Sequence, residues 1–172
     1  MPGTAEQKQA FFSSSKFAVV GASKDETKFG TKATCTEITQ VLKYYIERNK
    51  DVTPVHPKES EIQGIAAVKT LADLPDPSHT SVSVITGPKV RQPFGTALPM
   101  SLFTHRTLAH PAQITLGLLE QAKTLDVPAL WLQPGADDET VVNFINENGL
   151  ADRVVYGGPC VLVEGDGILQ SL

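Results

Sequence analysis

Short apolar runs alternate with longer segments of helical periodicity along most of this chain. The runs are rich in Val, Ile and Leu and are bounded by Gly or Pro, which is typical of strands buried on both faces. In the longer segments, apolar residues recur every three or four positions, as on one face of an amphipathic helix. The predicted strands are 16–21, 52–57, 81–86, 128–133 and 153–156, and the predicted helices are 31–49, 114–125 and one between Asp137 as N-cap and Gly149 as C′ residue.

The two ends of the chain are shorter pieces. A short N-terminal helix is predicted to carry Phe11 and Phe12 onto the core, and residues 161–163 are predicted as a terminal extended piece. We expect residues 1–16 to form an N-terminal extension and residues 17–172 to form the domain.

Alternating strands and helices predict parallel βαβ units with right-handed crossovers. The expected fold class is α/β: a Rossmann-like, doubly wound, parallel five-stranded sheet in a three-layer α/β/α single domain. With the strands numbered in chain order, we expect the order 3-2-1-4-5. The ligand crevice would then lie at the carboxyl ends of strands 1 and 4.

The segment 90–113 fits neither pattern. It holds Pro93, Pro99 and Pro111, two histidines and no steady periodicity. We interpret it as an atypical insertion at the carboxyl end of the third strand, on the ligand side. Three interpretations stay open: a lid, a surface excursion or disordered loop, which is the commoner fate of such long segments, and a translated intron whose removal would join residues 87–89 to 114–116.

Charge and composition narrow the choice of partner. Hydrophobic residues make up 41% and charged residues 20%, and the formal net charge is −4. This balance disfavours nucleic acid and anionic membranes, which need a basic face, but it is compatible with a small anionic ligand. No apolar run approaches the roughly 20 residues of a membrane span. Since Cys35 and Cys160 show no CxxC spacing, we expect reduced thiols and a cytoplasmic location, with mitochondrial targeting left open.

The loop after the first strand carries the strongest chemical signal. Gly21 ends a strand, a polar loop follows, and a helix begins after it. Such a loop places backbone N–H groups and a helix N-terminus at one point, which is an arrangement that binds phosphate. Ser23 can donate a hydroxyl, Lys28 can add charge, and Gly30 permits close backbone approach. The pattern is not GxGxxG, and an ordinary strand-to-helix turn is the competing interpretation.

The tip of the second strand discriminates between nucleotides. NAD-binding domains usually carry a carboxylate there, which accepts from the ribose hydroxyls. Here the strand ends in His56, Pro57 and Lys58. A basic tip suits a phosphorylated ribose, as in coenzyme A or NADP, although a solvated strand end is the simpler alternative.

Two further strand ends supply candidate binding residues. Thr86 and Pro88 flank a rigid turn whose apolar surface suits an adenine ring. The alternative is that these residues serve only to form the turn. Gln133 after the fourth strand can hydrogen-bond a ligand, and Gly135 lets the chain pass close to it. We interpret Trp131 as a core residue, and Cys160 as a small buried residue in preference to a reactive thiol.

No catalytic or metal-binding pattern emerges. The histidines show no metal-ligand spacing with carboxylates or thiols, and no Ser-His-Asp arrangement or G-x-S-x-G elbow is present. Asp137, Asp138 and Glu139 are best explained as helix N-terminal charge.

These residues together resemble the small stand-alone CoA-binding domain proteins, which are similar to the N-terminal domain of the succinyl-CoA synthetase α subunit. The resemblance covers most of 17–163 and rests on 17–23, 28–30, 54–58, Gly64, 70–75, 131–135 and Cys160. It departs from the family at His56, where Asn is frequent, and at the 90–113 insertion. The phosphohistidine and succinate chemistry of the synthetase belong to another domain, so that activity does not carry over.

The resemblance implies roles for particular residues, within a Rossmann-like fold of the NAD(P)-binding domain superfamily. It places the pyrophosphate at Gly21, Ala22 and Ser23, with Lys28, Phe29 and Gly30 following; the phosphorylated ribose near His56, Pro57 and Lys58; the adenine by Thr86 and Pro88; and the pantetheine side near Gln133, Pro134 and Gly135.

The leading hypothesis is therefore a CoA-binding or acyl-CoA-binding module without chemistry of its own. One alternative is an NADP-dependent oxidoreductase or another NAD(P)-binding protein. An oxidoreductase would need a general acid near the nicotinamide, and the sequence offers no convincing one. A second is an interaction protein with a vestigial nucleotide site. A third is a thiol-active protein in which Cys160 forms a mixed disulfide with CoA. A protein partner remains open.

Overall fold

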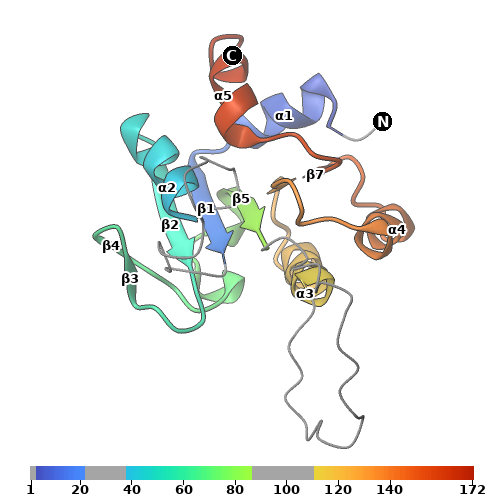
Figure 1. Ribbon diagram of the computed structural model, residues 1–172, viewed down its shortest axis with the longest axis horizontal. Coiled ribbons are helices and arrows are strands. Elements are labelled where there is room, and N and C mark those ends of the chain that lie inside the picture. Colours follow the sequence, from blue (N-terminus) through green and yellow to red (C-terminus); the bar gives the residue numbers. More distant parts are fainter. Residues whose placement is uncertain (1–2, 22–37, 87–110) are drawn as a thin grey trace, which may run out of the picture.

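The computed structural model describes residues 3–21, 38–86 and 111–172 (Figure 1). Its centre is a parallel sheet, which confirms the predicted α/β class. Five strands pair in this sheet: β1 (Lys16–Gly21), β2 (Asp51–Val55), β5 (Thr80–Ile85), β6 (Leu130–Leu132) and β7 (Val154–Val155).

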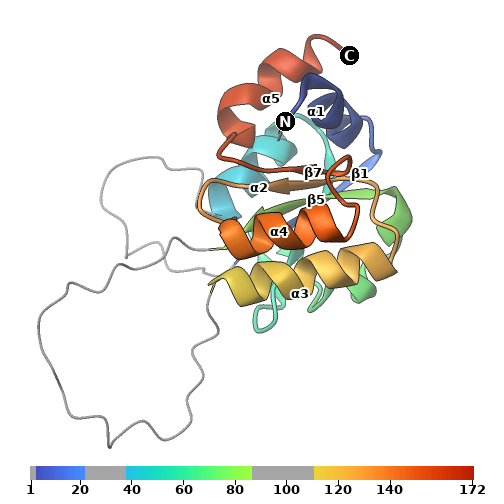
Figure 2. The ribbon, with the colours of Figure 1, turned by 90° about the vertical axis from the view of Figure 1, so that its right-hand side faces the viewer.

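Helices cover both faces of this sheet, so the predicted three-layer arrangement is confirmed (Figure 2). One face is covered by α1 (Ala5–Phe12), α2 (Ile38–Glu47) and α5 (Val161–Leu169), and the other by α3 (Pro111–Thr124) and α4 (Glu139–Glu147). Phe11 and Phe12 of α1 are buried in the core, as the sequence predicts.

The strand order corrects the expectation. The sheet runs β2-β1-β5-β6-β7, which is 2-1-3-4-5 in the numbering of the predicted strands. The predicted order 3-2-1-4-5 is therefore wrong. After β2 the chain crosses over β1 and pairs β5 on its far side, with Gly21 opposite Ile85. The crevice created by the change of direction therefore lies between β1 and β5, and not between β1 and β6.

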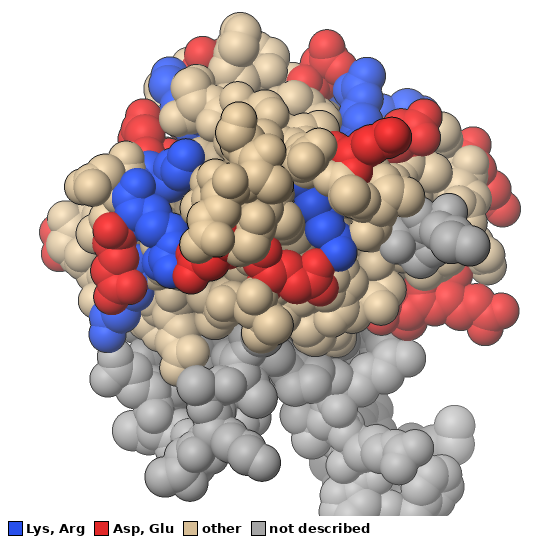
Figure 3. Space-filling model, turned by 90° about the horizontal axis from the view of Figure 1, so that it is seen from above, with Lys and Arg blue, Asp and Glu red and all other residues tan. Residues whose placement is uncertain are grey.

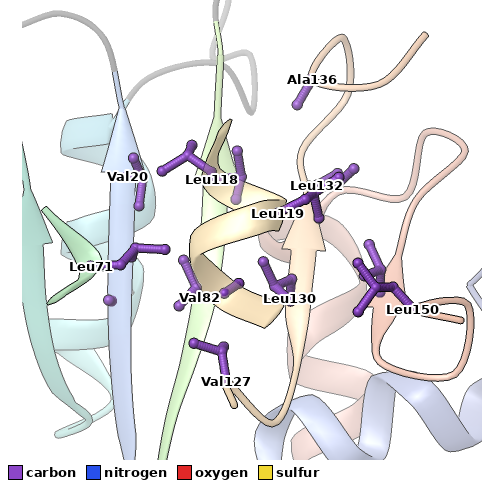
Figure 4. Packing of buried hydrophobic residues seen from close by; sticks show 14 of the residues in the cluster. Val20, Leu71, Val82, Leu118, Leu119, Val127, Leu130, Leu132, Ala136 and Leu150 are labelled. Atoms are coloured by element: carbon purple, nitrogen blue, oxygen red, sulfur yellow. The ribbon is translucent and has the colours of Figure 1, made fainter. Parts of the chain in front are cut away.

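The crossover from β2 to β5 is built from short pieces. It contains no α-helix, and consists of a small hairpin and two single turns: β3 (Glu61–Ile62), β4 (Ile65–Ala66), η1 (Leu71–Asp73) and η2 (Pro77–His79). Leu71 and Leu74 are buried with Ala18 and Val20 of β1 and with α3 (Figure 4). These two leucines supply the apolar cover that a crossover helix normally provides.

The helix boundaries differ from prediction at three places. Residues 161–163 begin α5 and are not an extended piece. The helix predicted at 114–125 begins at Pro111, inside the segment that we interpreted as an insertion. The N-cap of α4 is Asp138, whose carboxylate accepts from the Val141 N–H, and not Asp137. Gly149 has φ +64°, as predicted for a residue after a helix C-terminus.

Candidate functional site

The candidate site is the sheet edge where β1 and β5 end. The chain leaves β1 toward α2 on one face and leaves β5 toward α3 on the other. Neighbouring parallel strands whose connections diverge in this way open a crevice at their carboxyl ends, which is where α/β proteins bind ligands. Because β2 and β6 flank this pair, the residues after all four strands meet at one edge.

The structure brings together part of the residue set predicted from the sequence. Gly21, Thr86 and the residues that follow β2 and β6 lie along this edge in strand order. Ala22, Ser23, Lys28, Phe29, Gly30 and Pro88 lie outside the described residues, as does the 90–110 part of the predicted insertion.

His56 is held by the turn that follows β2. Its side chain is buried, and Nδ1 accepts backbone N–H groups from Lys58 (3.2 Å) and Glu59 (3.0 Å). Since Nδ1 is an acceptor in this turn, the ring proton lies on Nε2, which leaves a neutral N–H donor. Lys58 is exposed, so the positive charge predicted at this tip comes from the lysine rather than from His56.

Thr86 belongs to a buried chain of hydroxyl groups. Its Oγ1 lies 3.0 Å from Thr115 Oγ1 in α3, and the Thr115 hydroxyl donates to the carbonyl of Ala136 at 2.8 Å. Because the one proton of Thr115 goes to that carbonyl, Thr86 donates to Thr115 and keeps only acceptor capacity for a ligand. The chain joins the end of β5, α3 and the loop after β6.

Gln133 extends β6 to the same edge and is 1% exposed. Its backbone N–H donates to Val84 at 2.9 Å, and its side-chain Oε1 accepts the Val161 N–H at the start of α5 (3.2 Å). Its Nε2 is buried and has no hydrogen-bond partner among the described residues. Gly135 follows with φ +91°, a backbone conformation that favours glycine, and it is exposed.

The loop between β7 and α5 lies beside Gln133 and is fixed from two sides. Trp131 Nε1 donates to the carbonyl of Pro159 (3.0 Å), and the Gly157 N–H donates to Asp137 Oδ2 (3.0 Å). Trp131 is fully buried, which confirms its interpretation as a core residue. Its indole N–H also anchors the loop, and that role depends on a tertiary contact that the sequence does not show.

Sequence reasoning missed two residues that support the site. Thr115 was predicted only as part of a helix, although a threonine on the buried side of an amphipathic helix requires a hydrogen-bond partner. Asp137 was assigned to the helix N-terminus, whereas its carboxylate holds Gly157. Two consecutive aspartates precede this helix, and one N-cap needs only one of them. That surplus could have indicated that the other aspartate has a partner elsewhere.

Cys160 is the N-cap residue of α5 and is 7% exposed, so its predicted burial is confirmed. It is disulfide-bonded, which contradicts the expectation of a reduced thiol. Sequence spacing does not show which thiols meet in a fold. Cys35 lies outside the described residues.

Two searches of the described residues bear on other kinds of site. None of their helices combines the length and apolar character needed to cross a bilayer. Within 3–21, 38–86 and 111–172, no three His, Cys, Asp or Glu side chains gather in a way that could hold a metal ion.

Comparison with known proteins gives a family and a fold. A sequence profile of the family described as "CoA binding domain" matches residues 15–96 and 104–166. A search of curated proteins gives no match. Among solved structures, a hypothetical protein from Pyrococcus horikoshii OT3 is similar, with TM-score 0.64, 23% identity, and 96% of this chain and 92% of that chain covered.

Two further solved structures have a similar fold. A protein from Thermus thermophilus has TM-score 0.63 and 23% identity, and the match covers 96% of this chain and 98% of that chain. A conserved hypothetical protein from Pyrococcus furiosus has TM-score 0.57 and 24% identity, and the match covers 87% of this chain and 97% of that chain. At these identities the likeness shows the fold.

Proposed function

Since this chain belongs to the family of CoA binding domains, we propose that it binds coenzyme A or an acyl-CoA at the carboxyl edge of β1 and β5. The observation that carries the proposal is the order of groups along that edge. The His56 N–H and the Lys58 ammonium follow β2, Gly21 ends β1, Thr86 follows β5, and Gln133 follows β6. Phosphate-binding groups therefore stand at one end and amide and hydroxyl groups at the other.

The proposed ligand follows this order. Lys58, with His56 and Pro57, contacts the phosphorylated ribose, and the loop of Gly21, Ala22 and Ser23, with Lys28, Phe29 and Gly30, contacts the pyrophosphate. Thr86 and Pro88 lie by the adenine, and Gln133, Pro134 and Gly135 lie by the pantetheine. The protein acts as a binding module in the cytoplasm that senses, buffers or presents its ligand, without catalysis of its own.

Titration calorimetry at fixed salt with CoA, acetyl-CoA, NAD and NADP tests the proposal. Preferential binding of the CoA species supports it. Preference for NADP favours an oxidoreductase on the same fold, because its ribose phosphate also suits Lys58. Absence of binding to all four ligands contradicts the proposal and favours an interaction protein with a vestigial site.

The double variant Ser23→Ala, Lys58→Ala tests the assignment of the phosphates. It removes one hydroxyl and one charge from the proposed contacts, and we expect CoA affinity to fall by about tenfold or more, since hydrogen bonds to charged groups are worth about 1.5–3 kcal/mol. Lys123→Ala is the matched control, because Lys123 lies in the last turn of α3 and bonds Asn148. Unchanged CoA affinity in the double variant, with the fold intact by circular dichroism, contradicts the assignment.

A further inference from the structure

A cavity lies at the outer edge of the sheet, away from the ends of β1 and β5. β7 is the edge strand there, and α1 and α4 lie on either side of it (Figure 1). The cavity has a volume of about 480 Å³, which is within the size range of small-molecule sites. It is lined by the start of α1, by Asn146 of α4, by Ala151 and Asp152 of the turn before β7, and by Tyr156 after β7.

The walls of this cavity are held together by Gln7 of α1. Its Oε1 accepts the Thr4 N–H (2.8 Å), and Thr4 Oγ1 in turn accepts the Gln7 N–H (3.3 Å). Gln7 Nε2 donates to the carbonyl of Ala151, in the turn between α4 and β7. The Gln7 side chain therefore ties α1 to that turn with both of its polar ends. The cavity is a preformed hollow between fixed elements, so a small ligand can enter it without rearranging them.

Tyr156 presents a polar group to this cavity. The residue is 8% exposed and belongs to the aliphatic cluster that includes Leu150 and Val154. Its hydroxyl has no hydrogen-bond partner in the described part of the chain. In that part, Gln133 Nε2 is the one unpaired side-chain polar atom that is sealed from solvent, so the unpaired Tyr156 hydroxyl opens to the cavity that its residue lines. A buried ring with a free hydroxyl at its tip is suited to bind a ligand there.

The charges at this cavity are negative. Glu6 of α1 and Asp152 line it, both are exposed, and neither has an ion pair or hydrogen bond within 3–21, 38–86 and 111–172. The nearby cations are used elsewhere: Lys8 pairs with a carboxylate of α5, and Arg153 pairs with Asp126 at 2.6 Å. No described residue that lines the cavity is Lys, Arg or His. The local field therefore favours a cation and disfavours a phosphate.

The kind of cation follows from the groups that surround it. A bound calcium or magnesium ion needs about six oxygen ligands at short distance, whereas the described residues hold no group of three His, Cys, Asp or Glu that could bind a metal. Two carboxylates, the Tyr156 hydroxyl and the exposed side-chain amide of Asn146 surround a hollow far larger than an ion. The N–H groups of an ammonium or a guanidinium can donate to each of these oxygens.

We propose that the cavity between α1, α4 and β7 binds a small organic cation, an amine or a guanidinium compound, through the Tyr156 hydroxyl and the carboxylates of Glu6 and Asp152. The cationic group donates to the hydroxyl oxygen, and the two carboxylates compensate its charge. The inference is independent of the proposed function, because none of these three residues belongs to the set proposed for the nucleotide.

Titration of ¹⁵N-labelled protein by NMR at low ionic strength tests the proposal with three probes. Agmatine carries a guanidinium and an ammonium, putrescine carries two ammonium groups, and butane-1,4-diol has a similar length without charge. We expect agmatine or putrescine to shift the amide signals of Ala151, Asp152 and Tyr156 to saturation, and the tighter of the two identifies the preferred head group. Added salt should weaken this binding, since the carboxylates are exposed. The diol should cause no saturable shift.

Tyr156→Phe is the most direct variant, because it keeps the ring and removes only the hydroxyl. We expect the affinity for the cation to fall by about tenfold or more, the loss of a hydrogen bond to a charged group. The double variant Glu6→Gln, Asp152→Asn changes two exposed side chains and carries the test if Tyr156→Phe does not fold; we expect a loss of about fivefold. Glu147→Gln is the matched control, because this exposed carboxylate of α4 lines a different groove, and it should leave the affinity unchanged.

The following outcomes overturn the inference. Absence of a saturable shift with both cations at millimolar concentration shows that the cavity binds neither class. Binding of the diol as tight as that of the cations shows that charge is not recognised. Unchanged affinity in a folded Tyr156→Phe variant shows that the hydroxyl makes no contact. A loss in Glu147→Gln equal to that in the double variant shows that the cations respond only to the net charge of the protein.

Discussion

The two faces of the sheet are packed with different kinds of side chain. The face under α1, α2 and α5 is aromatic, and the rings interlock: Phe11 meets Trp131 edge-on at 5.4 Å between centroids, and Phe17 stacks on Tyr45 at 5.0 Å. The face under α3 and α4 is aliphatic, built mainly from Leu, Val and Ala (Figure 4). Aromatic rings have preferred contact geometries, whereas aliphatic side chains fill space with little directional demand.

Polar contacts strengthen this difference. On the aromatic side, Arg48 lies 3.7 Å over the Tyr44 ring and binds Asp166 of α5 through Nε (2.6 Å) and Nη2 (2.7 Å). Lys8 of α1 pairs with Glu164 of α5. Figure 3 shows basic and acidic side chains next to one another on the surface seen from above. The aromatic face is thus held in one arrangement, while the aliphatic face can adjust to small changes in side-chain shape.

The largest expected effect comes from Trp131→Ala. Removing this buried ring is expected to cost about 3–5 kcal/mol of unfolding free energy, against about 2–5 kcal/mol for Leu119→Ala on the aliphatic face, measured by urea unfolding. Both side chains are fully buried. Only the Trp131 change also releases Pro159, so amide hydrogen exchange at Gly157 and Gly158 should accelerate in that variant alone. Equal acceleration in both variants contradicts the anchoring role.

An effect of intermediate size on the free energy of unfolding is expected from glycines in the helices on the two faces of the sheet. A Cβ on Gly165 would lie 2.1 Å from Tyr44 Oη and 3.0 Å from Phe12 Cζ. Because Asp166 accepts the Tyr44 hydroxyl at 3.0 Å, the ring cannot move away freely, and Gly165→Ala should destabilise by about 1–3 kcal/mol.

Matched controls for Gly165 lie in the same helix and on the opposite face of the sheet. A Cβ on Gly167 of α5 or on Gly117 of α3 would meet no described atom within 4 Å, so alanine there should stabilise by up to about 1 kcal/mol. Thermal unfolding of the three variants decides between a packing effect and a general effect of alanine. Stabilisation by Gly165→Ala contradicts the close approach of α5 to Tyr44.

The smallest expected effect is electrostatic and depends on pH. The guanidinium of Arg48, followed by the Tyr44 hydroxyl, lowers the pKa of Asp166. Its folded pKa therefore lies below its unfolded pKa, so its stabilisation is present above the unfolded value and is lost as the pH falls through the folded value. Asp166→Asn should lower the melting temperature at pH 7, and the gap to wild type should narrow as the pH falls below about 4, the usual pKa of an aspartate.

Asp152→Asn is the control for this pH effect, since Asp152 is exposed and has no ion pair within the described part of the chain. It should leave the melting temperature nearly unchanged at both pH values. If the difference in melting temperature between Asp166→Asn and wild type stays constant with pH, the ionic contribution of Asp166 is contradicted.

Local patterns predicted the elements well where the determining residues are close in sequence. The apolar stripe of α4, its acidic start and Gly149 lie within or directly beside one helix, and the prediction missed only the choice between Asp137 and Asp138 as N-cap. That choice depends on Gly157, which lies far along the chain. The predicted strand order was wrong for the same reason. No residue pattern within the 56–79 crossover indicates on which side of β1 the next strand pairs.

The wrong prediction of an extended piece at 161–163, where α5 begins, has a related cause. Val161, Leu162 and Val163 have strand-like character, and Gly165 and Gly167 weaken a helix. The packing of Gly165 on Tyr44 and Phe12 overrides these propensities. At the candidate site, the sequence identified Gln133 and His56 as polar residues at strand ends. Their fixed orientations depend on the Val161 N–H and on the turn after β2, which only the fold provides.

The place of α5 after every other described element in the sequence has a consequence for synthesis. Phe11, Phe17 and Tyr45 of the aromatic face leave the ribosome well before α5, which is made after every other described element. Until Gly165 and Asp166 emerge, that face has no cover from α5, and the nascent chain exposes apolar rings that favour aggregation or chaperone binding. A chain that stops before Val161 should therefore be far more aggregation-prone than the chain that includes α5.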